Sequence, residues 1–363
     1  MQTNGVILKA KEWLYILVMI VTLFALPAQA EVAPTLELRA AIPYSKVTGP
    51  DSVQVHYPHP LGVTPNTSYE APPFGFIRRG NSVYFGAGCR EYDLLSNTLK
   101  CDLPKNLNGK YISYDGEVFW GCLDEKKDRS DGSVLFYRND GSSSSPPRAC
   151  YEKIIHPSSS YSADGEGIPH KSYISLHFRN INTGKFVAIS LKGEKSVTDF
   201  YGYTGNGRYV IADGNWIDLK LRKPTNIYFG SVANYDATIL ATRESLITVI
   251  DGENVQKSSL SALRINASGK RSYLWRHQPF GDALAFSWNS KYLLTGGAET
   301  KLIEVATGKV ILDNLKGDRG AKFSPDGMTF VTTDEVGFYI YSLPKGSPPL
   351  FGKYPGPSYV PKF

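Results

Sequence analysis

Long apolar runs are absent from the sequence after residue 30, and no later segment reaches the ~20 apolar residues that a membrane-spanning helix requires. The same region shows no 3.6-residue apolar periodicity, which argues against a helical fold. It also lacks a Gly-x-Ser-x-Gly elbow, a phosphate-binding loop and a dinucleotide-binding fingerprint. We therefore predict no catalytic residue and no cofactor, and we favour a protein that is not an enzyme.

A strong excess of one charge is also missing. The chain has 40 Lys and Arg against 34 Asp and Glu, which gives a formal net charge of +6 over 363 residues. This excess is too small to indicate a nucleic-acid-binding surface. It is typical of a soluble protein, with weak contact to anionic lipid or glycan surfaces as the alternative.

Metal-ligand patterns are weak. His56 and His59 are close in sequence but have no carboxylate or cysteine nearby, so they indicate a surface loop. Residues 128–133 resemble the start of a calcium loop but lack the bidentate Glu at the twelfth position. We predict no metal site.

Cysteine is scarce, and all four cysteines lie in the first half of the chain. An even number in an exported chain indicates two disulfides, and sequential pairing closes the shortest loops. The other two connectivities remain open, whereas a zinc site is disfavoured because no Cys-x-x-Cys pairs are present. The predicted bridges join Cys89 to Cys101 and Cys122 to Cys150.

Export is predicted by residues 1–30. Lys9 and Lys11 precede an apolar run over residues 14–26, and residues 28–30 form a small-x-small cleavage site. A retained anchor is the alternative, but Pro27 ends the run before it could span a bilayer. We expect cleavage after Ala30 and a periplasmic or secreted protein without a stable membrane span.

Aromatic, glycine and proline residues are abundant, with 23 Tyr, 17 Phe, 34 Gly and 23 Pro. Aromatic and β-branched runs between Gly and Pro turns favour strands, so the fold class is predicted to be all-β. Residues 282–343 contain two copies of one three-strand pattern, 37 residues apart. A repeat of this length is typical of a propeller or a solenoid.

Residues 303–309 resemble the last strand and Thr-Gly turn of a WD-type repeat, with Ile303 and Glu304 at the Trp and Asp positions. No repeat carries Trp-Asp itself, and the Gly-His pair of that family is absent. Successive Asp-like positions are on average about 41 residues apart, the length of a four-stranded blade. The resemblance implies a WD-repeat-like β-propeller of seven four-stranded blades, with six or eight also compatible. The Asp-like positions are Asp93, Asn139, Asn180, Asp218, Asp251, Glu304 and Tyr341.

One propeller domain is predicted over residues 31–343. Its proline-rich first part, residues 31–80, is expected to supply the first strands, and in many propellers this segment also completes the last blade. The remaining residues, 344–363, form a tail rich in Pro and Gly, which is expected to be a strap over the surface or disordered.

The longest interval between Asp-like positions, from Asp251 to Glu304, predicts a protruding loop or hairpin. It is rich in Arg and Trp, which dominate binding hot spots, so we predict a partner-binding surface there. The alternative is an ordinary strand whose Trp packs in the core while its basic neighbours are solvated. The predicted binding residues are Arg271, Tyr273, Trp275, Arg276 and His277.

The predicted function is an exported scaffold that binds a protein partner of unknown identity. The alternative is a glycan-binding or glycan-processing protein with its site at the central channel. Glycosidic chemistry requires two carboxylates within ~5–10 Å. A channel lined by small or apolar groups, beside an exposed aromatic patch, favours the scaffold.

Overall fold

The chain divides into two compact units, Met1–Pro34 and Thr35–Phe363. The predicted signal peptide and its cleavage site lie outside the described residues. Within the described part of the chain, no helix is long and apolar enough to cross a membrane. The computed structural model describes residues 35–47, 74–77, 80–85, 90–100, 107–123, 134–138, 143–144, 152–155, 158, 161–164, 174–180, 183, 185–191, 200–212, 215–228, 231–250, 253–266, 270–278, 281–297 and 299–362.

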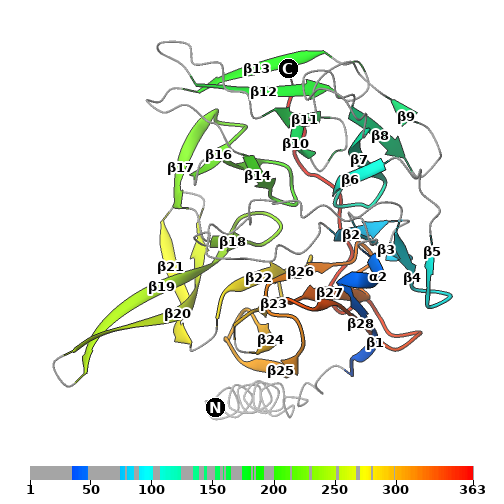
Figure 1. Ribbon diagram of the computed structural model, residues 1–363. Helices are drawn as coiled ribbons and strands as arrows, with labels where there is room; N and C mark the ends of the chain where they lie inside the picture. The colour runs from blue at the N-terminus through cyan, green and yellow to red at the C-terminus, as the bar shows by residue number, and fades with distance from the viewer. Residues whose placement is uncertain are drawn as a thin grey trace, which may run out of the picture. The chain divides into compact units, whose positions relative to one another are not determined.

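The described residues of the second unit form seven four-stranded antiparallel sheets and one short helix, α2 (Tyr44–Val47) (Figure 1). Six sheets are made of four consecutive strands. The first three sheets are β2 (Phe74–Ile77), β3 (Ser82–Phe85), β4 (Glu91–Asp93), β5 (Thr98–Lys100); β6 (Leu107–Ile112), β7 (Val118–Leu123), β8 (Val134–Arg138), β9 (Ser143–Ser144); and β10 (Glu152–Ile155), β11 (Tyr161–Asp164), β12 (Ile174–Asn180), β13 (Phe186–Leu191).

The next three sheets continue the same order along the chain. They are β14 (Phe200–Tyr203), β15 (Tyr209–Ala212), β16 (Asn215–Asp218), β17 (Lys223–Tyr228); β18 (Ser231–Ala233), β19 (Ile239–Ile250), β20 (Glu253–Ile265), β21 (Arg271–Gln278); and β22 (Ala283–Phe286), β23 (Tyr292–Thr295), β24 (Thr300–Glu304), β25 (Val310–Leu315).

Both ends of the second unit build the last sheet. Its strands are β26 (Gly320–Phe323), β27 (Thr329–Thr333), β28 (Gly337–Ser342) and, on the outside, β1 (Glu37–Pro43). β1 pairs antiparallel with β28, from Glu37 opposite Ser342 to Pro43 opposite Gly337. The N-terminal segment therefore completes the last sheet, as expected.

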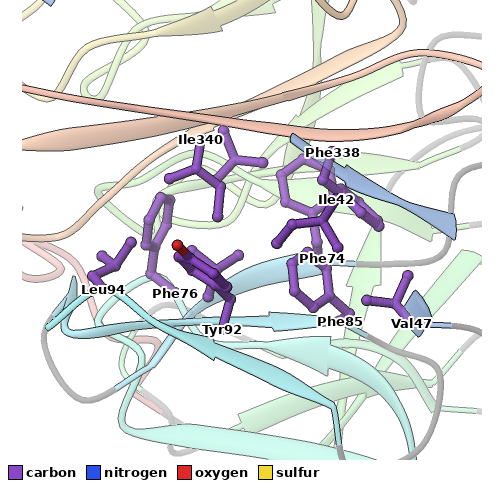
Figure 2. Packing of buried hydrophobic residues seen from close by; sticks show 11 residues of the cluster. Ile42, Val47, Phe74, Phe76, Phe85, Tyr92, Leu94, Phe338 and Ile340 are labelled. Atoms are coloured by element: carbon purple, nitrogen blue, oxygen red, sulfur yellow. The ribbon is translucent and has the colours of Figure 1, made fainter. Parts of the chain in front are cut away.

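A hydrophobic cluster joins this last sheet to the first one. Ile42 and Val47 from the N-terminal segment pack with Phe338 and Ile340 of β28 and with Phe74 of β2 (Figure 2). Every residue of β27 and β28 is buried. Strands covered on both faces carry runs of apolar residues rather than an alternating pattern, and this explains the sequence of β28.

Contacts between sheets follow the chain and return to its start. First strands of neighbouring sheets lie together in the pairs β2 and β6, β6 and β10, β10 and β14, β18 and β22, and β22 and β26. Asn206 donates a 3.0 Å backbone hydrogen bond to Tyr235, which joins the β14–β17 and β18–β21 sheets. Lys322 Nζ lies 2.6 Å from the carbonyl oxygen of Phe74 and joins the last sheet to the first. The protein is a β-propeller.

Several Asp-like positions fall where the repeat pattern places them, at the end of a third strand. Asp93, Asn180, Asp218 and Glu304 are the last residues of β4, β12, β16 and β24. Position 139 lies outside the described residues.

The assignment of Asp251 is wrong. Position 251 falls between β19 and β20, which are the second and third strands of their sheet. The corresponding residue is Asn266, whose N–H donates to the Lys270 carbonyl oxygen at 3.0 Å, as Glu304 donates to Lys309 at 2.8 Å. The extra length of this repeat therefore lies in the β19–β20 hairpin, before residue 266.

Candidate functional site

The two ends of each sheet are different. In four consecutive antiparallel strands, the first and third turns lie at one end and the second turn lies at the other. We call these the strap end and the hairpin end, because the C-terminal tail covers the first and the β19–β20 hairpin extends from the second.

The first turns at the strap end share a short pattern. A hydroxyl or amide residue is followed by any residue, by Asp or Asn, and then by a small residue. Ser324 Oγ donates to Asp326 Oδ1 at 2.5 Å, and Thr204 Oγ1 donates to Asn206 Oδ1 at 2.6 Å. The turns occupy residues 113–116, 204–207, 234–237, 287–290 and 324–327.

Residues 350–359 form a strap across these turns. The N–H of Phe351 donates to Gly327 at 3.2 Å, that of Tyr354 to Pro325 at 2.7 Å, and that of Tyr359 to Asn206 at 3.0 Å. The side chain of Phe351 is fully buried, in a cluster with residues of β23, β26 and β27. The tail is thus bound along its length to the sheet ends.

Tyr354 lies in an aromatic cluster built by the second residues of three turns. Its ring centre is 4.7 Å from that of Trp288, 6.0 Å from that of Tyr114 and 6.3 Å from that of Tyr235. Its hydroxyl donates to the carbonyl oxygen of Gly205 at 2.9 Å. Burial raises the pKa of the Tyr114 phenol to about 12 and raises that of Tyr354 further still. The cluster is therefore uncharged and well packed at neutral pH.

The innermost-strand side chains that the structure describes include small groups and the cation of Lys322. A Cβ on Gly202 of β14 would meet no atom within 4 Å, so open space lies beside this strand. The Lys322 side chain on β26 reaches water, but burial of its ammonium group, which donates to the Phe74 carbonyl oxygen, lowers the pKa of that group to about 8. Among innermost-strand residues whose side chains are described, none is Asp or Glu. In the described part of the chain, no group of three His, Cys, Asp or Glu residues could hold a metal ion.

The β19–β20 hairpin is longer than its sheet. Its strands pair from Ile239 opposite Arg264 to Ile250 opposite Glu253. β18 pairs only with positions 240–242, and β21 pairs only with positions 260–265. The distal part of the hairpin is therefore a two-stranded ribbon with no further strand on either edge among the described residues (Figure 1).

A polar cluster lies at the base of this ribbon. Tyr273 donates its phenolic hydrogen to Glu244 Oε1 at 3.0 Å, and Ser261 Oγ donates to Glu244 Oε2 at 3.0 Å. Arg276 stacks over the Tyr273 ring at 3.5 Å and donates to the Tyr273 hydroxyl at 2.6 Å. We call these four residues the Glu244 cluster. Tyr273 remains 42% exposed, so the cluster offers an aromatic ring, a cation and a carboxylate at the surface.

The predicted binding residues do not form one surface. Tyr273 and Arg276 lie together in the Glu244 cluster, and Arg271 is exposed at the start of β21. Trp275 is only 8% exposed, and its Nε1 donates to the Val305 carbonyl oxygen at 2.9 Å, so it is a core residue. The side chain of His277 lies outside the described residues.

A β-bulge explains why Tyr273 and Trp275 separate. Tyr273 pairs with Leu263, and Trp275 pairs with Ala262. Residues 273 and 275 of β21 are therefore opposite two adjacent residues of β20. Because adjacent residues of a strand point to opposite faces of the sheet, Tyr273 and Trp275 also point to opposite faces. Simple alternation predicts the same face for both. Sequence reasoning also missed Glu244, whose only signal is the polar pair Arg243–Glu244 inside an apolar strand.

The predicted disulfides lie outside the described residues. Positions 89, 101 and 150 are not described, and only the backbone of Cys122 in β7 is. The two bridges stay predictions. His56 and His59 are likewise outside the described residues.

Comparison with known proteins assigns no family to this chain. No family model matches the chain, and no curated protein matches it. Among solved structures, the chain is similar to the Cps50 (Swd1) β-propeller domain of Myceliophteria thermophila, with 13% sequence identity and a TM-score of 0.48. The match covers 76% of this chain and 97% of that one.

Proposed function

We propose that this chain is an exported, non-enzymatic scaffold that binds a protein partner at its hairpin end. The observation that carries this proposal is the two-stranded ribbon beyond position 242 of β19. A two-stranded ribbon in water is marginally stable by itself, and its open edges offer unpaired backbone groups to another chain. A partner strand or loop that packs against the ribbon would stabilise it and would pair with these backbone groups.

The composition of the ribbon supports this proposal. Residues 246–250 read Leu-Ile-Thr-Val-Ile and contain no charge or proline to protect the edge. The Glu244 cluster at its base supplies polar groups, among them the Tyr and Arg types common in binding hot spots. The strap covers the first turns at the opposite end of the sheets, whereas the ribbon at the hairpin end is not covered by another described strand.

Export is part of the proposal and rests on residues 1–30 of the sequence. The positive flank, apolar run and small-residue cleavage site predict secretion, so the partner would meet the propeller in the periplasm or outside the cell. The innermost-strand side chains that the structure describes are mostly small or apolar, apart from Lys322, and this supports a scaffold over a glycan-processing enzyme in the channel.

A crosslinking experiment tests the proposal. A photoreactive amino acid replaces Tyr273 in the Glu244 cluster or, as a control, Leu95, which is 77% exposed on another sheet. The same probe at Tyr273 is also placed in a variant whose residues 245–258 are replaced by an Asn-Gly turn, which suits the opposed pair Glu244 and Ser259.

We expect one dominant crosslinked protein from the native host with the Tyr273 probe in the full-length hairpin. The Leu95 probe and the shortened hairpin should not give it. If the shortened variant gives the same product, the ribbon is not the partner surface. If a folded and exported protein gives no product with any probe, a glycan or other small molecule in the channel becomes the better explanation.

A further inference from the structure

A basic groove lies at the strap end, on the β14–β17 sheet. One wall is formed by Leu219, Lys220 and Arg222 in the turn between β16 and β17, and the other is the end of the tail, residues 358–362. The cavity has a volume of about 360 Å³. It is carried by a different sheet from the β19–β20 hairpin and lies at the opposite sheet end.

Short hydrogen bonds fix both walls. On the tail, Tyr235 Oη donates to the Gly356 carbonyl oxygen at 2.5 Å, and the N–H of Tyr359 donates to Asn206 at 3.0 Å. On the turn, Asp218 Oδ1 accepts from the N–H groups of Lys220 and Leu221 at 2.9 and 3.0 Å. The groove is therefore formed before any ligand arrives, which lowers the entropic cost of binding.

The charge of the groove is of one sign. Lys220, Arg222 and Lys362 line it, and no Asp or Glu does. The carboxylate of Asp218, which precedes the turn, is already paired with Arg208 at 2.7 Å and is only 3% exposed. Among the described residues, none of the three lining cations forms an ion pair. Their combined field therefore remains available to an anionic ligand.

An apolar side chain also lines the groove. Val360 on the tail is 42% exposed and is among the few large apolar residues that the described surface exposes. A ligand that satisfies the whole groove thus carries carboxylates together with at least one apolar side chain.

We propose that the basic groove binds an extended acidic segment of a partner protein. Its carboxylates would pair with Lys220, Arg222 and Lys362, and an apolar residue would cover Val360. Charge complementarity carries the choice of ligand. The concave shape favours a peptide over a flat anionic membrane, because lipid headgroups in a plane do not fill a recess between two walls. This surface adds to the proposed function and does not depend on the hairpin.

The test measures binding of a fluorescein-labelled ten-residue peptide of alternating glutamate and leucine by fluorescence anisotropy. The variant carries Lys220→Glu, Arg222→Glu and Lys362→Glu. The matched control carries Lys270→Glu, Lys309→Glu and Lys345→Glu, which change the net charge equally at exposed positions away from the groove. A second variant ends after Gly356 and so lacks one wall but keeps Tyr354. Circular dichroism confirms that each variant is folded.

We expect the groove variant and the truncated variant to weaken binding by about tenfold or more, and the control variant to change it by about twofold or less. Equal weakening in the groove and control variants would overturn the proposal, since binding would then follow net charge alone. Retention of binding in the truncated variant would also overturn it.

Two further measurements separate the alternatives. If vesicles containing anionic phospholipid bind with the same dependence on the three cations while the peptide does not, the ligand is a membrane and the peptide proposal is wrong. The variant with the shortened hairpin should bind the peptide as the wild type does. Failure of the groove and failure of the hairpin surface are therefore distinguishable.

Discussion

The phenol of Tyr354 donates a 2.9 Å hydrogen bond to the carbonyl oxygen of Gly205, 149 positions earlier in the chain. This bond ties the strap to the β14–β17 sheet, while Phe351 is buried among residues of the last two sheets. The strap therefore links sheets that are not consecutive. It acts as a second closure of the propeller, in addition to the pairing of β1 with β28.

Gly205 should not tolerate a side chain. A Cβ there would lie 2.8 Å from Cδ2 of Tyr235 and 3.1 Å from Cζ3 of Trp288, two rings of the aromatic cluster. We expect Gly205→Ala to lower the free energy of unfolding by about 1–3 kcal/mol because the rings must move. Gly202→Ala is the matched control, since its Cβ meets no atom, and it should be neutral. Equal losses in urea denaturation of both variants would contradict the packing.

Trp275 and Tyr273 should differ sharply although both were predicted to bind a partner. We expect Trp275→Ala to cost about 3–5 kcal/mol in unfolding free energy, because the indole is buried and its hydrogen bond to Val305 is lost. Tyr273→Ala removes an exposed ring and should cost about 1 kcal/mol or less. Thermal or chemical denaturation compares the two. A stable Trp275→Ala protein would mean that the indole does not lie in the core.

Lys322 should react unusually fast with amine reagents. The surrounding protein lowers the pKa of its ammonium group to about 8, and the side chain is exposed to water. Its labelling by trinitrobenzenesulfonate, followed by mass spectrometry, should be half-maximal near about pH 8, well below the ordinary lysine value of 10.5. A midpoint close to 10.5 would show that the protein does not desolvate this group.

The lowered pKa of Lys322 also makes the stability of the protein depend on pH in a defined direction. Because the folded pKa lies below the unfolded value of 10.5, the unfolded state binds the proton more tightly. Lys322→Met should therefore be more stable than the wild type at about pH 7, and this advantage should shrink as the pH rises from about 8 to about 10.5. If the stability advantage of Lys322→Met grew between about pH 8 and about pH 10.5, the pKa of Lys322 would be raised in the folded protein and not lowered.

Asp93 should contribute to stability only above acidic pH. The Lys100 ammonium group and the N–H groups of Leu95 and Ser96 hold the pKa of its carboxyl at about 2, against 3.8 ordinarily. Its contribution is present above pH 3.8 and is lost as the pH falls towards 2. Asp93→Asn should melt lower than the wild type at about pH 6 and equally at about pH 2. A difference in melting temperature between Asp93→Asn and the wild type that is the same at about pH 6 and about pH 2 would contradict this assignment.

The sheet architecture could be predicted because the turns carry local chemistry. Asp218 accepts hydrogen bonds from the following turn and so ends its strand wherever the pattern recurs. The error at position 251 arose in the repeat whose hairpin is longer than the others. The sequence pair Asp-Gly lies there between the second and third strands, and it resembles the pattern expected after a third strand. The position at which the third strand ends follows from the long-range pairing of the strands, and a local sequence pattern does not contain that pairing.

The Glu244 cluster and the strap contacts could not be predicted in full. Glu244 and Tyr273 are 29 positions apart and meet only because β20 lies between their strands. The bulge that turns Trp275 away from Tyr273 leaves no mark in the sequence. The Pro and Gly content of the tail indicated a strap, but its partners Tyr114, Tyr235 and Trp288 come from three different sheets.

The pairing of β1 with β28 has a consequence for synthesis. β1 is made first among the described strands, yet the strand that it pairs with, Gly337–Ser342, is made last. While the chain is being synthesised, β1 has no partner and the first sheet lacks the neighbour that covers Phe74. Closure is therefore a late event that follows synthesis of β28, and pairings this distant in sequence fold slowly. During this interval, the exposed edges are the place where a chaperone would bind.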